Sequence, residues 1–144
     1  MNPLRQVSEH LQKHRNEKTA VVFDLDSTLF CVSPRTQAIL KQMIEQPDFQ
    51  GRFQREAEIL RDLEILPSDW GIKTALLRHQ VSTDAEFFKH VRDYWRKYFF
   101  SNHFLDQDQI YPSANEYVRH LHDLGAQIRY LTGRAQASME EGTL

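Results

Sequence analysis

The sequence has a single cysteine, Cys31, among its 144 residues, and it has no long apolar run. A lone cysteine excludes an internal disulfide, which is typical of proteins from a reducing compartment. The first 18 residues lack the apolar core of a signal peptide, and no segment approaches the roughly 20 apolar residues that span a membrane. We therefore expect a cytoplasmic protein without a membrane partner.

A large charge of either sign is also absent, because the formal net charge is only −2. This balance gives no electrostatic reason to expect nucleic acid as a partner. Apolar residues make up 40% of the chain and aromatic residues 11%, which is enough to build a core and excludes a disordered chain. The length predicts one domain, or one domain with a modest insertion.

Two apolar segments that are far apart in the sequence predict strands. Residues 19–25, TAVVFDL, are apolar and β-branched, which is typical of a strand covered by helices on both faces. Residues 126–134, AQIRYLTGR, predict a second strand. Helical patterns fill the interval, and strands joined by helical crossovers indicate a parallel α/β sheet.

Apolar residues at helical spacing predict helices before the first strand and between the two strands. The expected helices are an N-terminal one with Leu4, Val7 and Leu11 on one face, one with Ser33 as N-cap and Pro34 at its first position, one over residues 53–66, one from Ser68, one with a capping box of Thr83 and Glu86, and one from Ser113 to Gly125. The helix after Thr83 carries an aromatic stripe that includes Phe87, Trp95 and Phe99. We interpret this stripe as core packing rather than as a ligand platform.

Acidic and hydroxyl side chains stand directly after both predicted strands. Asp24 and Asp26 follow the first strand, and alternation along a strand would turn them to the same side, where they repel each other. A bound cation would offset that repulsion. Thr132 and Gly133 follow the second strand, and in open α/β sheets sites form beyond the carboxyl ends of the strands. We therefore expect these four residues in one site.

These residue types suit phosphoryl transfer. A carboxylate can attack phosphorus to form an aspartyl-phosphate, and a second carboxyl group can protonate the leaving alkoxide and then deprotonate the attacking water. A hydroxyl and backbone N–H groups at the neighbouring strand end can hold the phosphoryl oxygens, while Mg²⁺ neutralises the approaching anions. Asp24, Asp26 and Thr132 fill the first three roles in that order.

Simpler interpretations stay open for several acidic residues. One is that Asp24 and Asp26 only cap a turn, with a helix starting at residues 27–28. A further acidic pair, Asp106 and Asp108, is interpreted as two solvated loop residues rather than as a second acidic site.

The two motifs resemble those of the haloacid dehalogenase (HAD) superfamily. FDLDSTL, residues 23–29, is similar to the first motif, DxDx[TV], in its phosphatase form, and IRYLTGR, residues 128–134, is similar to the second. The helical block between them resembles a class 1 cap. The resemblance implies a HAD-like α/β core with a parallel sheet over residues 1–30 and 106–144, incomplete at its C-terminus, and an inserted all-helical cap over residues 31–105.

The resemblance also implies a role for each site residue. Asp24 would be the nucleophile and Asp26 the general acid/base, with Mg²⁺ bound by the Asp24 carboxylate and the Asp26 backbone carbonyl. Thr28 would steady the loop and, with Thr132 and Gly133, contact the substrate phosphate. The implied activity is magnesium-dependent hydrolysis of a small phosphate monoester through an aspartyl-phosphate, and a phosphomutase of the same superfamily is the alternative.

Two further motifs of the superfamily, a lysine and then an acidic pair, are not found after Arg134. The sequence continues there with AQASMEEGTL, in which Glu140 and Glu141 follow no predicted strand. We expect the missing half to be supplied by a longer parent chain or by another chain. The remaining alternative is a catalytically incomplete fragment that acts as a binding or assembly module.

Overall fold

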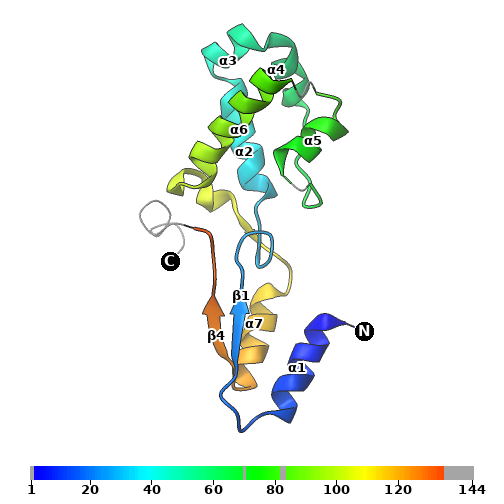
Figure 1. Cartoon of the computed structure of the whole chain (residues 1–144), viewed down its shortest axis with the longest axis vertical. Helices are drawn as coiled ribbons and strands as arrows, with labels where there is room; N and C mark the ends of the chain where they lie inside the picture. The colour runs from blue at the N-terminus through cyan, green and yellow to red at the C-terminus, as the bar shows by residue number, and fades with distance from the viewer. Residues whose placement is uncertain (1, 70, 82–83, 135–144) are drawn as a thin grey trace. The chain divides into compact units, whose positions relative to one another are not determined.

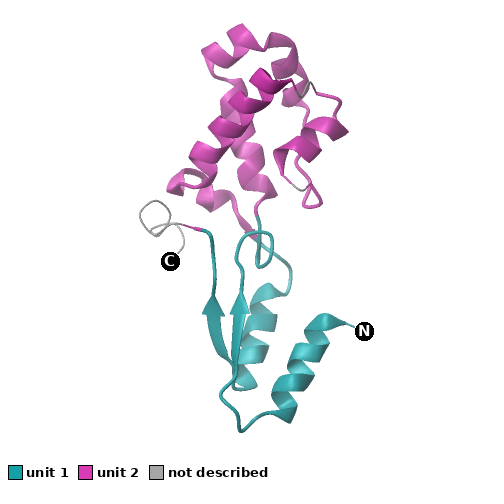
Figure 2. Ribbon diagram, viewed as in Figure 1, with its two compact units in different colours: residues 1–31, 110–133 teal, residues 32–109, 134–144 magenta. Residues whose placement is uncertain are grey.

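The computed structural model describes residues 2–69, 71–81 and 84–134 of the chain. These residues form two compact units, which Figure 2 distinguishes by colour. Of the described residues, unit 1 contains those in the ranges 2–31 and 110–133, and unit 2 contains those in the range 32–109 together with Arg134. The chain therefore passes between the units three times. In the described part of the chain, no helix has the length and apolar character needed to cross a membrane.

Unit 1 is built on a two-stranded parallel sheet (Figure 1). Strand β1, Ala20–Phe23, pairs with β4, Gln127–Tyr130, so that Val21 lies opposite Ile128. The parallel direction is possible because the chain makes a long, mainly helical excursion between the two strands. This mixed α/β arrangement confirms the predicted fold class.

Two helices cover one face of this sheet. They are α1, Pro3–Lys13, and α7, Ala114–Asp123. The buried side chains between helices and sheet are Leu11, Leu121 and Ala126, with Val21, Phe23, Tyr117, Leu124 and Ile128 packed against them. The hydroxyl of Tyr117 also donates to the backbone carbonyl of Leu4 at 2.8 Å, which joins α7 to α1.

The other face of the sheet is uncovered in the part of the chain that the structure describes. Val22, which alternates with the buried-face residues Val21 and Phe23, is 56% exposed, and Leu131 just after β4 is 71% exposed. The prediction that helices cover β1 on both faces is therefore wrong for the described residues. The apolar character of residues 19–25 indicated burial but could not say which elements would provide it.

Unit 2 is helical. Its helices are α2, Ser33–Ile44; α3, Pro47–Arg52; α4, Gln54–Arg61; α5, Ile72–Arg78; α6, Ala85–Phe99; and the 3₁₀ helix η1, Asn102–Gln107. Outside these helices, the short strands β2 (Phe30–Cys31) and β3 (Gln109–Ile110) pair with each other in a second two-stranded sheet. Strand β2 belongs to unit 1, and the boundary between the units falls within β3.

The core of unit 2 confirms the predicted apolar faces of α2 and α6. Ile39, Leu40, Met43 and Ile44 of α2 are all buried, and so are Phe87, Val91 and Phe99 of α6. The aromatic stripe packs against other rings of this core: Phe87 meets Phe49 and Phe53 at centroid distances of 6.2 Å and 5.4 Å. The stripe is thus core packing, as predicted.

Two helix starts differ from the sequence prediction. Ser33 is the first residue of α2 rather than its cap, and Val32 occupies the cap position without a side-chain hydrogen bond. Helix α6 is capped by Asp84, whose side chain accepts from the N–H groups of Glu86 and Phe87 at 3.0 Å. The predicted cap Thr83 and the acids Glu140 and Glu141 lie outside the described residues.

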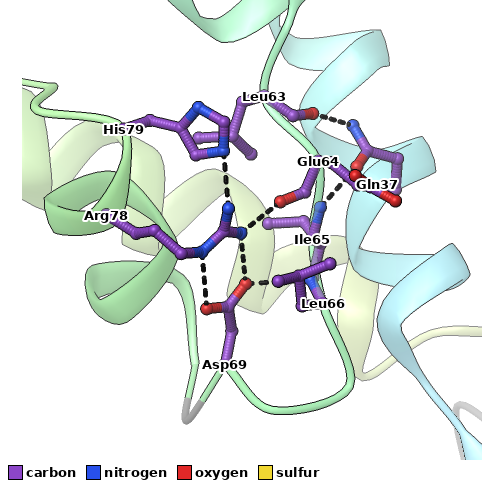
Figure 3. Close-up of polar contacts among 8 residues, drawn as sticks. All are labelled: Gln37, Leu63, Glu64, Ile65, Leu66, Asp69, Arg78 and His79. Atoms are coloured by element: carbon purple, nitrogen blue, oxygen red, sulfur yellow. Dashed lines mark hydrogen bonds and ion pairs between the residues drawn. The ribbon is translucent and has the colours of Figure 1, made fainter.

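The helix predicted over residues 53–66 ends at Arg61, and the one predicted from Ser68 begins only at Ile72. Figure 3 shows polar contacts that hold residues 63–66 and Asp69 in a loop between these two helices. The side chain of Gln37 on α2 donates to the Leu63 carbonyl and accepts from the Ile65 N–H, each at 2.8 Å. These bonds take up backbone groups that a longer helix would use itself.

Asp69 and Arg78 complete this loop. The guanidinium of Arg78 donates from Nε and Nη2 to the two carboxylate oxygens of Asp69, at 3.2 Å and 2.8 Å. Asp69 also accepts from the N–H of Leu66 at 2.9 Å, and Arg78 donates to the Glu64 carbonyl. The Arg78 hydrogen bond holds the pKa of Asp69 below its ordinary value, with the Leu66 bond acting in the same direction.

We predict that Asp69→Asn destabilises unit 2 by about 1–2 kcal/mol at pH 7, because a charge-assisted bidentate contact is lost while Arg78 stays partly solvated. The pKa of Asp69 is lowered in the folded protein. Its contribution is therefore present above the ordinary carboxyl pKa of about 4 and disappears as the pH falls through the lowered value. Urea unfolding between pH 7 and pH 3, followed by tryptophan fluorescence, measures this, since Trp70 and Trp95 both fall in the 32–109 range.

The control is Asp62→Asn, which changes an exposed acid in the same loop and should alter the unfolding free energy by less than about 0.5 kcal/mol. A difference between wild type and Asp69→Asn that persists undiminished at pH 3 would contradict the ion-pair explanation.

Candidate active site

The first motif forms a tight loop directly after β1. Asp24 is the first residue beyond the strand and is exposed, Leu25 is buried, and Asp26 is half-buried. The two carboxylates thus flank a side chain that anchors the loop in unit 1. This alternation follows the two-residue period expected at the end of a strand.

Backbone hydrogen bonds close the loop. The Leu25 carbonyl accepts from the N–H groups of Leu29 and Phe30, both at 3.0 Å, and the Ser27 N–H donates to the Phe30 carbonyl at 2.8 Å. Ser27 takes a left-handed conformation with φ of 61°, which turns the chain back on itself. The loop is therefore held in its conformation by main-chain hydrogen bonds.

The Thr28 hydroxyl donates to Oδ2 of Asp24 at 3.3 Å and so orients this exposed carboxylate. No helix begins at residues 27–28, since the next described helix is α2, which starts at Ser33. The alternative in which Asp24 and Asp26 cap such a helix is therefore wrong. The bond from Thr28 is the contact expected of a residue that steadies the loop.

The second motif lies beside the first at the same edge of the sheet. The Leu131 N–H donates to the Phe23 carbonyl at 2.8 Å, which extends the β1–β4 ladder one residue beyond β4. Thr132, half-buried, and Gly133, exposed, follow at once. Because neighbouring parallel strands end at the same edge, the structure brings the segment of Asp24 next to that of Thr132.

The chemistry of this edge suits a hard cation. Asp24 and Asp26 offer only oxygen ligands, the type that Mg²⁺ prefers. Among residues 2–134, in so far as they are described, no group of three or more histidine, cysteine or acidic side chains could hold a metal. Mg²⁺ usually keeps several waters and binds one or two carboxylates together with phosphate oxygens.

Sequence reasoning missed one buried charged cluster. Asp106 is exposed as predicted, but the side chain of Asp108 is only 4% exposed and lies between Arg134 and Arg35, at 2.8 Å and 3.0 Å. The interpretation of Asp108 as a solvated loop residue is therefore wrong. The sequence did contain an indication of this cluster. Arg35 lies on the same helix face as the buried Ile39, and a buried arginine requires an acidic partner.

Comparison with known proteins gives one match. A family model described as haloacid dehalogenase-like hydrolase matches residues 18–143, a stretch that includes both motifs and the helices between them. No curated protein and no solved structure matches the chain significantly.

The left-handed residue in the loop gives a test of the local geometry. We predict that Ser27→Gly makes unit 1 more stable than Ser27→Ala by about 1 kcal/mol, because only glycine takes a positive φ without steric cost. Amide hydrogen exchange of β1 and β4 measures the stability of unit 1. In a helix, glycine should instead be less stable than alanine. Ala38→Gly in α2 should therefore lower the stability of unit 2 by about 1 kcal/mol. An alanine variant at position 27 as stable as the glycine variant would refute the loop conformation.

Proposed function

The chain belongs to the haloacid dehalogenase-like hydrolases, and from this premise we propose that it hydrolyses phosphate monoesters with Mg²⁺ through an aspartyl-phosphate. One observation carries the proposal: the pairing of β1 with β4 brings an oriented carboxylate, Asp24, to the sheet edge where Thr132 and Gly133 follow the neighbouring strand. A nucleophile and groups for binding a phosphoryl oxygen are the minimum that this reaction needs.

In the first step, Asp24 is the nucleophile. Its Oδ2 accepts from Thr28, so we assign the attack on phosphorus to Oδ1. The new bond joins Oδ1 to phosphorus while the bond from phosphorus to the ester oxygen breaks. Asp26, two residues away and half-buried, donates its proton to the leaving alkoxide.

In the second step, water hydrolyses the aspartyl-phosphate. The water oxygen attacks phosphorus while Asp26, now ionised, takes a proton from that water. The bond between phosphorus and Oδ1 of Asp24 then breaks. Phosphate leaves, Asp24 returns as a carboxylate and Asp26 as a carboxylic acid. The same two side chains therefore serve both halves of the cycle.

Thr132 and Gly133 are proposed to bind the phosphoryl oxygens. A half-buried hydroxyl can donate to one oxygen, and the exposed backbone at Gly133 can approach another closely, because glycine has no Cβ. Built on this glycine, a Cβ would meet no atom of the described residues within 4 Å.

Mg²⁺ is proposed to bind the Asp24 carboxylate and the Asp26 backbone carbonyl. When bound, it would offset the negative charge that accumulates where a carboxylate meets a phosphate. The donor set supports this assignment because it contains oxygen atoms only.

The proposed substrate is a small phosphorylated molecule, and unit 2 is proposed to act as the cap that helps to select it. Transfer of the phosphoryl group to a sugar hydroxyl instead of water would make the protein a phosphomutase, and product analysis with a phosphosugar distinguishes the two.

The experiment that tests this function uses two isosteric variants in the full-length protein with Mg²⁺ and para-nitrophenyl phosphate. Asp24→Asn removes the nucleophile, so we expect turnover below detection. Asp26→Asn keeps the nucleophile but removes the proton donor, so turnover should fall by about 10²- to 10⁴-fold. Asp123→Asn, at an exposed acid in the same unit, is the matched control and should keep the wild-type rate.

A second readout does not depend on turnover. Beryllofluoride binds aspartate carboxylates as an analogue of phosphoaspartate, and ¹⁹F NMR detects the bound form. We expect the bound signal with wild type and Mg²⁺, and its loss in Asp24→Asn. Wild-type turnover or a wild-type bound signal in Asp24→Asn would exclude this residue as the nucleophile.

Thr28 should contribute through its hydroxyl. We predict that Thr28→Val lowers kcat about tenfold, because the carboxylate loses the bond that orients it. Thr28→Ser keeps the hydroxyl and should keep most of the rate. Steady-state kinetics of both variants measure the effect, and equal rates for valine and serine would show that the bond has no catalytic role.

A further inference from the structure

Three charged side chains of unit 2 flank the three points at which the chain passes between the units. The passages follow Cys31, Gln109 and Gly133. Arg35 stands in the first turn of α2 shortly after the first passage, Asp108 immediately precedes β3 at the second, and Arg134 is the residue directly after the third.

These three side chains form one buried ionic cluster. Oδ2 of Asp108 lies 2.8 Å from Nη2 of Arg134, and its Oδ1 lies 3.0 Å from Nε of Arg35. The side chains are 4%, 5% and 0% exposed, respectively. A carboxylate shared by two arginines in surroundings this dry is held much more firmly than an ion pair on the surface.

The cluster is anchored on the helices of unit 2. Arg35 donates from Nη1 to the Phe99 carbonyl at 3.0 Å, and its guanidinium lies 3.9 Å from the centre of the Phe99 ring. The backbone N–H of Asp108 donates to the Leu105 carbonyl at the end of η1. Two members of the cluster are therefore fixed by secondary structure, and Arg134 is held through its bond to Asp108.

Arg134 follows Gly133 in the chain, and no described side chain packs against the position of a Cβ at Gly133. A Cβ at Gly133 would meet nothing within 4 Å, and glycine has the widest conformational freedom of any residue. A restraint on Arg134 therefore limits the conformations of Gly133, whose position no described neighbour limits by packing.

We propose that Asp108 is a positioning residue: by holding Arg134, its buried carboxylate fixes Thr132 and Gly133 in the conformation that binds phosphate. This rests on the proposed function in one respect, namely that Thr132 and Gly133 contact the phosphoryl group. Asp108 itself touches neither substrate nor metal in this proposal.

The test measures backbone order directly, by ¹⁵N relaxation of residues 131–134. In wild type we expect order parameters near 0.85, the value of rigid backbone, and in Arg134→Gln and Asp108→Asn values below about 0.6. Arg134→Gln leaves the Asp108–Arg35 pair in place, so this variant decides the question if Asp108→Asn does not fold. The double variant should be no more disordered than Arg134→Gln alone, since both changes remove the same contact.

Asp69→Asn is the matched control. It too removes a carboxylate that is 4% exposed and lies 2.8 Å from an arginine of unit 2. It should lower the stability of unit 2 without changing the order parameters of residues 131–134. Comparing Asp69→Asn with the two cluster variants therefore distinguishes the positioning of residues 131–134 from a general loss of stability in unit 2.

The functional consequence is measured with inorganic phosphate and Mg²⁺, by the shift of the Gly133 amide signal. Arg134→Gln and Asp108→Asn should weaken binding about tenfold, the equivalent of one charge-assisted hydrogen bond, and Asp69→Asn should not weaken it.

Unchanged order parameters in both cluster variants would overturn the proposal, and so would an equal loss of order in Asp69→Asn. If wild type shows no phosphate shift at all, the proposed function fails, while the order parameters still decide whether Asp108 positions this segment.

Discussion

The parallel pairing of β1 with β4 is the interaction on which the candidate site depends. It places the residues that follow two distant strands at one edge of one sheet, and the first motif and Thr132 meet only there. Two strands alone form few ladder bonds and make a marginal sheet. The contact of α1 and α7 with one face of the sheet, through Leu11 and Leu121, therefore stabilises the geometry of the site as well as unit 1.

The sequence predicted strands β1 and β4 and the longer helices, but not the short elements α3, η1, β2 and β3, and it predicted helix ends less well. Apolar spacing identified the buried face of α2 because burial of Ile39 and Met43 depends only on which side of the helix they occupy. Helix ends depend on tertiary hydrogen bonds instead. No local pattern shows that Gln37, on another helix, will bind the backbone groups of Leu63 and Ile65, and those bonds replace the helix that the apolar residues alone predicted.

For the site, the predictable part was the part determined by strand topology. Residues after parallel strands must share an edge, so Asp24 and Thr132 could be placed near each other without coordinates. The surroundings of Asp108 could not be predicted in this way, because its partners Arg35 and Arg134 come from distant positions in the sequence. The sequence around Asp108 identifies an acid in a loop. It does not contain both of the arginines that offset the cost of burying this carboxylate.

The register of the sheet has a consequence for the order in which the protein folds. Val21 pairs with Ile128, roughly 100 residues later, so the sheet has a high contact order, whereas Gln42 on α2 and Tyr94 on α6 form a hydrogen bond across 52 residues. Loop-closure entropy grows only slowly with length, but it must be overcome before the distant pairing stabilises anything. Prior folding of residues 32–109 shortens the loop that remains to be closed. On the ribosome, Asp24 is synthesised before β4, the strand that precedes Thr132, so the candidate site can assemble only after residues 32–109 have been synthesised.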